Sequence, residues 1–515
     1  MEKLTRANNQ QPKANGCQTL WTGIIFIIKF NMQQLSGLDA TFLYIESARA
    51  PMHVGGVYIF EPSEKGERID YYQFRDFIES RLHISRVFRQ RLVEAPLDMS
   101  HPYWIEDPNF DLEYHLQYVA IPQPGGSKEL LDLAARIFSR TMDRKRPLWE
   151  LTIVEGLNIE GYPKNSFALI SKVHHAAIDG GSGAEMMGAL LNPSPKKPKA
   201  VSDEEHYWEA ERIPTGIEIV ARNYIKSVGT PVKLAKFLYE AVGNTIDVAR
   251  EAIGKWIEPP PMPFSAPTTL FNAPVTPHRI FDGANLPLER IKKMKNIANT
   301  TVNNVVLAIC AGALRLYLKD KNNLPKKPLV AMAPISVRSE EEKGAMGNKV
   351  SAMLVSLATN EEDPIKRLML IHESASSSKV YSKALGANTI MDLVPSELAA
   401  LAARLYTETK VVEYIRPVYN LVITNVPGPP IPLYMGGAKL LSHYGTAPLI
   451  DGLGLLMVVF SYAGSITISA TSCRELMPDL NKFIENIYQS ADELEKALEI
   501  VAVASEKAKK AKSKE

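Results

Sequence analysis

The stretch ISKVHHAAIDGGSGAEMM, residues 170–187, decides how the rest of the sequence is interpreted. Its apolar beginning is typical of a buried strand, and two adjacent histidines, His174 and His175, stand where that strand ends. Asp179 follows four positions after His175, and a glycine-rich turn at Gly180 leads into a helix-like segment. Neighbouring side chains of a strand point to opposite faces, so we expect one histidine to face a cavity and the other to pack behind the turn.

Four chemical interpretations compete for these residues. A metal site of His174, His175 and Asp179 is disfavoured, because adjacent histidines chelate one ion poorly and the sequence shows no other ligand cluster. A Ser-His-Asp hydrolase requires a nucleophile elbow such as GxSxG in a strand–turn–helix context, and none is found. A purely structural histidine pair stays open. So does a single imidazole base acting on a bound hydroxyl or amine, since neutral imidazole, with a pKa near ~6.5, accepts a proton at cellular pH.

Composition narrows the class of protein. The chain has 515 residues, 45% of them apolar, which is too long for one ordinary core and predicts two or more domains. A net charge of only +2 gives no electrostatic case for nucleic acid. The three cysteines, Cys17, Cys310 and Cys473, are scattered, which disfavours a disulfide framework or a structural zinc site and suits a reducing cytosol.

Changes in composition along the chain predict five segments. Residues 1–31 are expected to lie outside the fold, and residues 32–191 to form a first lobe that carries HHAAIDG. Residues 192–278 begin with a proline- and charge-rich linker and continue as amphipathic helices. Residues 279–500 are expected to form a second lobe, followed by a solvated lysine-rich tail over residues 501–515.

Local patterns predict both strands and helices in each lobe. HVGGVYIF (His53–Phe60) and SFALISKV (residues 166–173) are strand-like, whereas TTVNNVVLAICAGALRLYLKD (residues 300–320) is helix-like. Residues 452–473 predict two strands joined around Ala463 and Gly464. Strands mixed with unevenly spaced helices favour an α+β fold over a solenoid or a regular barrel.

Two segments bear on membrane contact. The apolar run of residues 20–30 is shorter than the about 20 residues that a membrane-spanning helix needs, and we expect no segment of spanning length in the chain. Residues 213–257 carry an apolar stripe with basic residues beside it, which suits either a connector packed on a domain or a helix lying on a lipid surface.

Beyond the motif, several stretches carry a resemblance to a known family. HHAAIDG matches the HHxxxDG motif of the coenzyme A-dependent acyltransferase superfamily. Six further stretches stand in this order along the chain: LSGLDATFLYIESARAPMHVGGVYIFEP, RPLWELTIVEGL, TVNNVVLAICAGALRLYL, APISVR, NVPGPP and GLGLLMVVFSYAG. They resemble, in the same order, stretches of the bacterial wax ester synthase/diacylglycerol acyltransferase family. The chain therefore resembles that family over nearly everything after residue 32.

The resemblance implies a two-lobed, chloramphenicol acetyltransferase-like α+β fold with an active-site tunnel between the lobes. It implies acyl transfer from a fatty acyl-coenzyme A to diacylglycerol, to a long-chain alcohol, or to both. His175 would be the general base, His174 and Asp179 would support the loop, and Gly180 would allow a tight turn beside the substrate. Acyl-coenzyme A would be a co-substrate, and no metal or permanently bound cofactor is implied.

Weaker candidates come from the family's other motifs. Asn303 matches the asparagine of an Asn-Asp pair, with Asn304 in place of the aspartate. Asn303 either assists at the active site, shapes the tunnel, or caps a helix. Arg338 either meets a phosphate of coenzyme A or makes an ordinary salt bridge. Trp149, in PLWE, is expected to pack rather than to react.

Two rival functions remain on the sequence alone. One is a condensation-type enzyme that takes its acyl group from a carrier protein, and the other is a catalytically inactive protein that binds lipid bodies. Because the implied substrates are lipids, we expect a cytoplasmic protein in peripheral contact with the inner membrane face or with lipid bodies.

Overall fold

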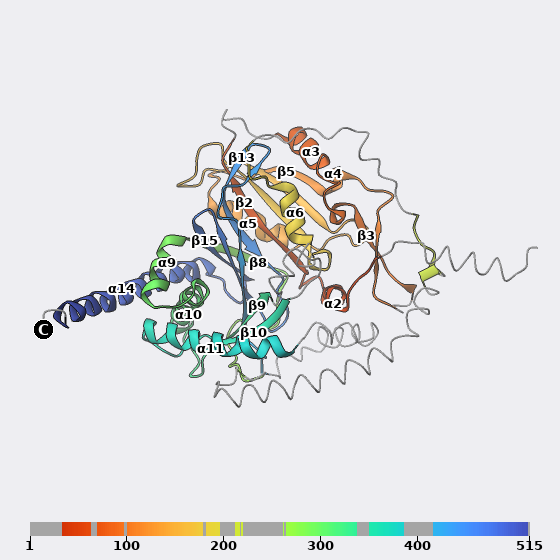
Figure 1. Ribbon diagram of the computed structural model, residues 1–515. Coiled ribbons are helices and arrows are strands. Elements are labelled where there is room, and N and C mark those ends of the chain that lie inside the picture. The colour runs from red at the N-terminus through yellow and green to blue at the C-terminus, as the bar shows by residue number, and fades with distance from the viewer. Residues whose placement is uncertain are drawn as a thin grey trace, which may run out of the picture.

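The computed structural model shows an α+β molecule built around two six-stranded sheets, with a small three-stranded sheet beside them (Figure 1). Helices cover the outer faces of the large sheets, and the two sheets approach each other at the centre of the molecule. The structure describes residues 33–62, 70–96, 100–178, 182–195, 212–216, 218–219, 261, 264–336, 350–385 and 416–512.

The first large sheet joins segments from both ends of the chain. Its pairs are antiparallel except for β5 and β6, which run parallel. Its strands, in spatial order, are β12 (Tyr434–Met435), β13 (Ala438–Thr446), β2 (His53–Phe60), β7 (Phe167–His174), β6 (Trp149–Glu155) and β5 (Leu116–Ala120). Because β13 pairs with β2, the range predicted for the second lobe also supplies one side of the first sheet.

Strand β7 lies near the middle of this sheet and is buried at every position. One face is covered by α5 (Ser127–Phe138), and the other packs against α3 (Tyr71–Glu79) and α6 (Ser182–Leu190). A strand buried on both faces reads as a continuous apolar run, which explains why residues 166–173 show no polar alternation. The sheet therefore holds the end of β7 rigidly.

The second large sheet forms the other lobe. Strand β11 pairs in parallel with β14 and with β9, and the remaining pairs are antiparallel. Its strands, in spatial order, are β10 (Val350–Ser356), β9 (Val330–Ser336), β11 (Leu421–Pro427), β14 (Leu455–Tyr462), β15 (Ser465–Cys473) and β8 (Arg279–Pro287). Four helices gather against it: α9 (Leu288–Ile297), α10 (Val302–Asp320), α11 (Pro364–Leu385) and α14 (Leu480–Lys512).

Helix α10 is the central helix of this lobe. It is long and apolar enough to cross a membrane, which corrects our expectation that no segment reaches spanning length. However, 72% of its apolar stretch is buried inside the fold, where α10 packs against α11 and α14. Its apolar character is therefore accounted for by core packing.

A smaller sheet is formed by segments on both sides of β2 in the sequence. Strands β1 (Gln33–Gln34), β4 (Tyr103–Glu106) and β3 (Gln90–Val93) form the three-stranded sheet. Two short elements adjoin its strands in the sequence: α2 (Gly37–Ile45) and the 3₁₀ turn η1 (Arg86–Phe88). Helix α4 (Leu112–His115) contacts α3 and strands β5 and β6 of the first large sheet. Helix α2 begins at Ser36, whose side chain accepts a hydrogen bond from the Asp39 backbone, and it lies next to the turn that follows β7.

Several local predictions are confirmed. Strand β2 has the predicted bounds, β7 is shifted by one residue, and β14 and β15 turn at Ala463 and Gly464. Helix α14 continues through Lys512, so most of the predicted lysine-rich tail is helical. Residues 1–31 and nearly all of the amphipathic stretch 213–257 lie outside the described residues.

Candidate active site

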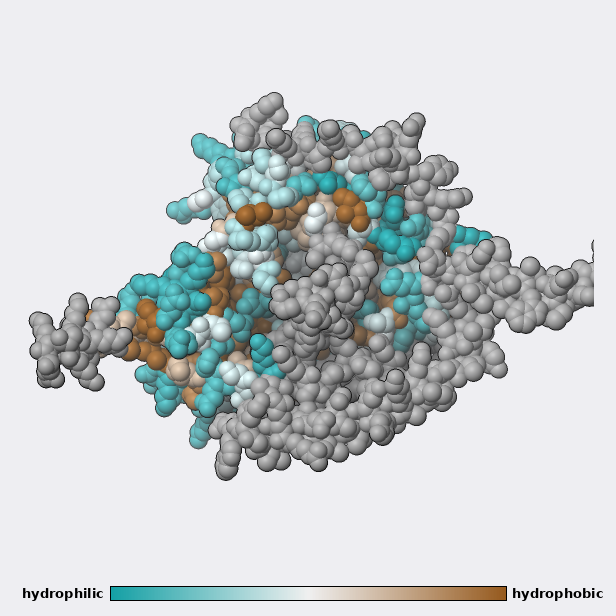
Figure 2. Space-filling view, in the orientation of Figure 1, coloured by the Kyte–Doolittle hydropathy of each residue, from teal (hydrophilic) through white to brown (hydrophobic). Residues whose placement is uncertain are grey.

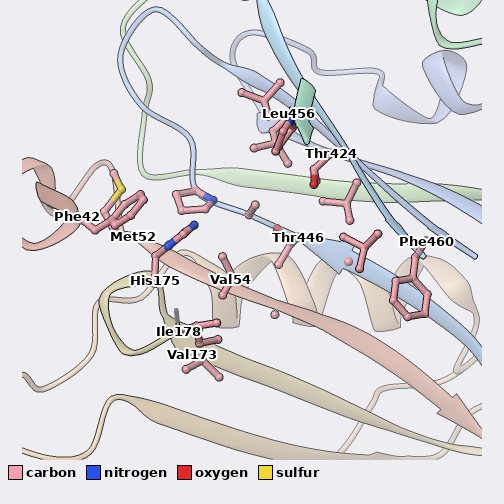
Figure 3. Close-up of a pocket in the computed structure, with 18 of the residues that line it drawn as sticks. Phe42, Met52, Val54, Val173, His175, Ile178, Thr424, Thr446, Leu456 and Phe460 are labelled. Atoms are coloured by element: carbon pink, nitrogen blue, oxygen red, sulfur yellow. The ribbon is translucent and has the colours of Figure 1, made fainter. Parts of the chain in front are cut away.

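The end of β7 sends its two histidines in opposite directions. His174 is the last residue of the strand and is 1% exposed, whereas His175 opens the 3₁₀ turn η3 (His175–Ala177). The backbone N–H of His175 donates to the carbonyl of Met52 at 2.7 Å, which ties the turn to the start of β2. His175 projects into a cavity (Figure 3), while His174 packs behind the turn, as strand alternation predicts.

The His175 ring is held as a neutral imidazole. It stacks on Phe42 of α2, with ring centroids 3.8 Å apart and planes 16° from parallel. Its Nδ1 atom is buried, which leaves Nε2 as the ring nitrogen available to a ligand. Burial lowers the pKa of His175 to about 4, and the nearby His174 acts in the same direction. At cellular pH, His175 can therefore accept a proton.

The cavity in front of His175 lies between the two large sheets and has a volume of about 470 Å³. That volume is within the about 300–1,000 Å³ typical of small-molecule sites. Strands β2, β7 and β13 line one side, and β9, β11 and β14 line the other. None of the described lining residues is Asp, Glu, Lys or Arg. The cavity therefore suits a long apolar chain.

The few polar groups in the lining are uncharged. His443 of β13 stacks on Tyr58 at 4.2 Å between ring centroids and meets the edge of Phe460 at 4.4 Å. Burial lowers the pKa of His443 to about 3 and raises that of Tyr58 to about 12. Both side chains thus stay neutral at cellular pH, and the interior keeps a low polarity.

Charged groups gather behind the turn instead. Glu46, which ends α2, has a side chain only 4% exposed. Its Oε1 atom lies 3.4 Å from Nε2 of His174 and 3.5 Å from Nε2 of His53. Arg144 donates two hydrogen bonds to Oε2 of Glu46, at 2.7 and 3.0 Å. Burial alone would raise the pKa of Glu46, but His174 and Arg144 outweigh it and lower this pKa to about 2.

Hydrogen bonding fixes the tautomer of His174. The backbone N–H of Ala176 donates to Nδ1 of His174 at 3.0 Å, so Nδ1 carries no proton. The ring proton then sits on Nε2, which faces the Glu46 carboxylate. His174 is therefore fixed by the cluster behind it and does not face the cavity.

The structure places Asn303 outside the cavity. Asn303 lies in the first turn of α10, where its Oδ1 accepts a hydrogen bond from Nδ2 of Asn425 at 3.0 Å, and neither side chain lines the cavity. The interpretation of Asn303 as the helix cap is wrong, because Thr301 caps α10 by accepting from the Asn304 backbone. Asn304 is buried and contacts Nδ1 of His372 at 2.8 Å.

Other predicted residues separate into two groups. Trp149 is fully buried, and its Nε1–H donates to the Phe88 carbonyl at 3.0 Å, which is a packing role. Asp179, Gly180 and Arg338 lie outside the described residues, so their predicted roles stay predictions. Within the described part of the chain, no group of three or more His, Cys, Asp or Glu side chains is arranged to hold a metal ion.

Sequence reasoning missed Phe42, Glu46 and Arg144. Phe42 and Glu46 stand in FLYIES, four positions apart on one short helix, so both can face the same neighbour. The strand alternation that puts one histidine inward also implies a buried polar partner for it. Glu46 is the carboxylate just before the strand that pairs with β7, and that proximity was the available signal.

Comparisons with known proteins find relatives that match nearly the whole chain. The model of the wax ester synthase/diacylglycerol acyltransferase catalytic domain matches residues 35–306, and the model of the WS/DGAT C-terminal domain matches residues 346–495. A probable diacylglycerol O-acyltransferase, tgs2, of Mycobacterium tuberculosis is 34% identical, over 90% of this chain and 98% of that protein. The O-acyltransferase WSD of Acinetobacter baylyi is 30% identical, over 88% and 95% of the two chains.

A solved structure extends the similarity to three dimensions. The wax ester synthase/diacylglycerol acyltransferase of Marinobacter aquaeolei VT8 has 31% sequence identity and a TM-score of 0.64. The match covers 90% of this chain and all of that one. The two-lobed α+β fold is therefore shared along nearly the whole length.

Proposed function

The chain belongs to the wax ester synthase/diacylglycerol acyltransferase family, and we propose that it moves a long-chain fatty acyl group from acyl-coenzyme A to diacylglycerol, to a long-chain alcohol, or to both. Family membership makes the protein an acyltransferase. The named activities of its relatives, diacylglycerol O-acyltransferase and wax ester synthase, support these acceptors. The observation that carries the proposal is a neutral histidine in the wall of an apolar cavity whose described lining holds no charged side chain.

His175 acts as the general base. As the acceptor hydroxyl attacks the thioester carbon, Nε2 of His175 takes its proton, and a tetrahedral intermediate forms. When the carbon–sulfur bond breaks, the coenzyme A thiolate leaves and takes the proton from the imidazolium. The new ester then holds the acyl group, and His175 is neutral again for the next cycle.

The cavity binds the acyl chain and keeps water away from the thioester. Each methylene group buried there contributes about 0.8 kcal/mol. Val54 and Val173 from the first sheet and Leu456 from the second lie around the space in front of His175 (Figure 3). Excluding water favours transfer to the alcohol over hydrolysis of the thioester.

Supporting roles are proposed for the residues around the base. His174 holds the turn through the contacts described above, and Asp179 and Gly180 shape the loop that follows it. Asn303, paired with Asn425, fixes the start of α10 against β11, and Arg338 meets a coenzyme A phosphate.

The reaction is tested with purified protein and radiolabelled palmitoyl-coenzyme A, offered with either hexadecanol or dipalmitoylglycerol. We expect labelled wax ester, labelled triacylglycerol, or both. Free palmitate alone would mean hydrolysis and would contradict the proposal. Transfer only from a palmitoylated carrier protein would support the condensation-type alternative, and no product from any donor would support the inactive lipid-binding protein.

We also propose that the protein works in the cytoplasm at an anionic lipid surface, which the end of α14 contacts. This end projects beyond the rest of the fold (Figure 1). Ile500, Val501 and Val503 are 64%, 47% and 52% exposed there, and Figure 2 shows apolar side chains on it. Five lysines follow over residues 507–514, against one glutamate at 506 and one at 515. Exposed aliphatic groups beside lysines suit anionic headgroups.

Flotation with vesicles tests this contact. We expect binding to phosphatidylglycerol-containing vesicles, weaker binding to pure phosphatidylcholine, and release by high salt or carbonate. The double change Ile500→Asp and Val503→Asp should abolish flotation, whereas Ile431→Asp, at a side chain 50% exposed elsewhere, should not. Equal flotation of the two variants would contradict the contact.

A further inference from the structure

We propose that Glu46, held by Arg144, is the positioning residue for the His175 base. The inference rests on the proposed acyl transfer and assigns to that reaction a residue that does not touch the cavity. Glu46 is not among the lining residues, yet one of its oxygens reaches the His175 turn by two separate routes. Its role is to fix where the imidazole points.

The first route runs through the start of β2. The backbone N–H of Met52 donates to Oε1 of Glu46 at 3.1 Å. The carbonyl of the same residue accepts the backbone N–H of His175 at 2.7 Å. If Glu46 moved, Met52 would move with it and would displace the backbone of His175.

The second route runs through His174. Its Nε2 faces Oε1 of Glu46 at 3.4 Å, and its Nδ1 accepts the backbone N–H of Ala176 at 3.0 Å. The His174 imidazole thus joins the residues on either side of His175, and its other ring nitrogen lies within ion-pair distance of the carboxylate. The two routes together hold the turn on both sides of the base.

Arg144 keeps the carboxylate in place. It donates twice to Oε2 of Glu46 and once to the Leu43 carbonyl at 2.8 Å, near the end of α2. Because Oε2 is held by Arg144, Oε1 stays directed at Met52 and His174. The same short helix carries Phe42, whose ring stacks on the His175 ring. By holding the end of this helix, Arg144 also holds Phe42 in place.

The closest alternative is that Glu46 only stabilises the fold. The two roles differ in kinetics, because a displaced base lowers kcat while leaving the acyl chain's binding cavity intact. A displacement of about 1 Å at a reacting group costs on the order of 100-fold in rate. Measuring kcat and KM separately therefore distinguishes positioning from simple stabilisation.

Glu46→Gln is the main test variant, because it keeps the side chain's size and removes its charge. With palmitoyl-coenzyme A and the acceptor that the wild type uses, we expect kcat to fall about 10- to 100-fold and KM for the donor to stay within about two-fold. Arg144→Gln should lower kcat similarly. The double variant should lose no more than the larger single effect, because both changes break one unit.

Asp479→Asn is the matched control. This aspartate is also a carboxylate held by a cation and a hydrogen-bond donor, in the second lobe, where Oδ1 accepts from the Tyr317 hydroxyl at 2.7 Å and Oδ2 pairs with Lys321 at 2.5 Å. It lines no part of the cavity. Its loss should lower the melting temperature by a few degrees, as in Glu46→Gln, with kcat within about two-fold of the wild type.

Three outcomes would overturn the inference. The first is a normal kcat in Glu46→Gln, and the second is a loss of kcat/KM in that variant that comes entirely from a higher KM. The third is a loss of kcat in Asp479→Asn as large as the loss in Glu46→Gln. If Glu46→Gln does not fold, Arg144→Lys is the second variant. It keeps the positive charge but removes the pair of hydrogen bonds to Oε2 of Glu46, so it should still lower kcat. A normal kcat in that variant would then overturn it. A wild type that makes no ester would instead refute the proposed acyl transfer.

Discussion

In front of the end of β7, the described cavity lining holds no charged side chain, whereas behind it the buried Glu46 forms an ion pair with the partly exposed Arg144. One strand end separates the two regions, with His175 in the first and His174 against the second. A carboxylate beside His175 would raise its pKa and favour the charged imidazolium. The Glu46 carboxylate instead lies against His174, the residue before the base. It can therefore hold the turn while His175 stays neutral in an apolar site.

The largest loss of activity is expected from His175→Ala, which removes the base from the cavity side. The other histidine in the described lining, His443, packs against Tyr58 and Phe460 on β13 and does not stand on the η3 turn, so kcat should fall about 10²–10⁴-fold. The melting temperature should change little, because the ring lies at the cavity and not in the core. Turnover of labelled palmitoyl-coenzyme A with either acceptor measures the effect, and near-normal turnover would refute the assignment.

Adding a charge to the cavity should have the next largest effect. Thr424, on β11, lines the cavity opposite the first sheet (Figure 3). Thr424→Asp would place a carboxylate against the acyl chain, and kcat/KM should fall about 10- to 100-fold because its desolvation opposes binding. Thr424→Val, which has the same shape without charge, should stay within about three-fold of the wild type. Similar values for both variants would mean that the chain binds elsewhere.

The pH profile sharpens the comparison further. Since the pKa of His175 is lowered to about 4, the ring is neutral above that pH, and kcat/KM should be flat from pH 8 down to about 5. Below that range the ring gains a proton and can no longer accept one, so the rate should fall about ten-fold per pH unit. Recovery of activity on return to pH 7 separates titration from acid unfolding. An inflection near ~6.5 would show that His175 is solvated like a free histidine.

The smallest effect is expected at Asn303, which belongs neither to the cavity lining nor to the cluster around Glu46. Asn303→Ala removes the hydrogen bond to Asn425, which contributes about 1 kcal/mol to stability. We expect a melting temperature lower by about 2–4 °C and a kcat within about three-fold of the wild type. A loss of kcat larger than ten-fold would place Asn303 in the active site after all.

The sequence predicted the elements with strong local patterns. Strand β2, helix α10 and the β14–β15 hairpin follow from apolar periodicity and turn residues, which act over short distances. The opposite directions of His174 and His175 follow from strand alternation alone. These features depend on neighbouring residues, so a single sequence contains the information.

Long-range contacts were beyond local patterns. Strand β13 pairs with β2, with Tyr444 opposite Val57. The local sequence of neither strand indicates which strand it pairs with. Arg144 reaches Glu46 across 98 positions, and its sequence context is that of an ordinary surface residue. Such contacts are set by how the lobes fold together, which hydrophobic periodicity does not encode.

The most direct test of the account compares His174→Ala with His175→Ala in one experiment, with turnover of palmitoyl-coenzyme A and thermal melting measured on both. The account predicts that His175→Ala loses nearly all turnover and melts like the wild type. His174→Ala should lose several degrees of melting temperature and only part of its turnover, because a buried ring is removed from the cluster around Glu46. The opposite result, an inactive His174→Ala that melts normally beside an active His175→Ala, would contradict the central claim.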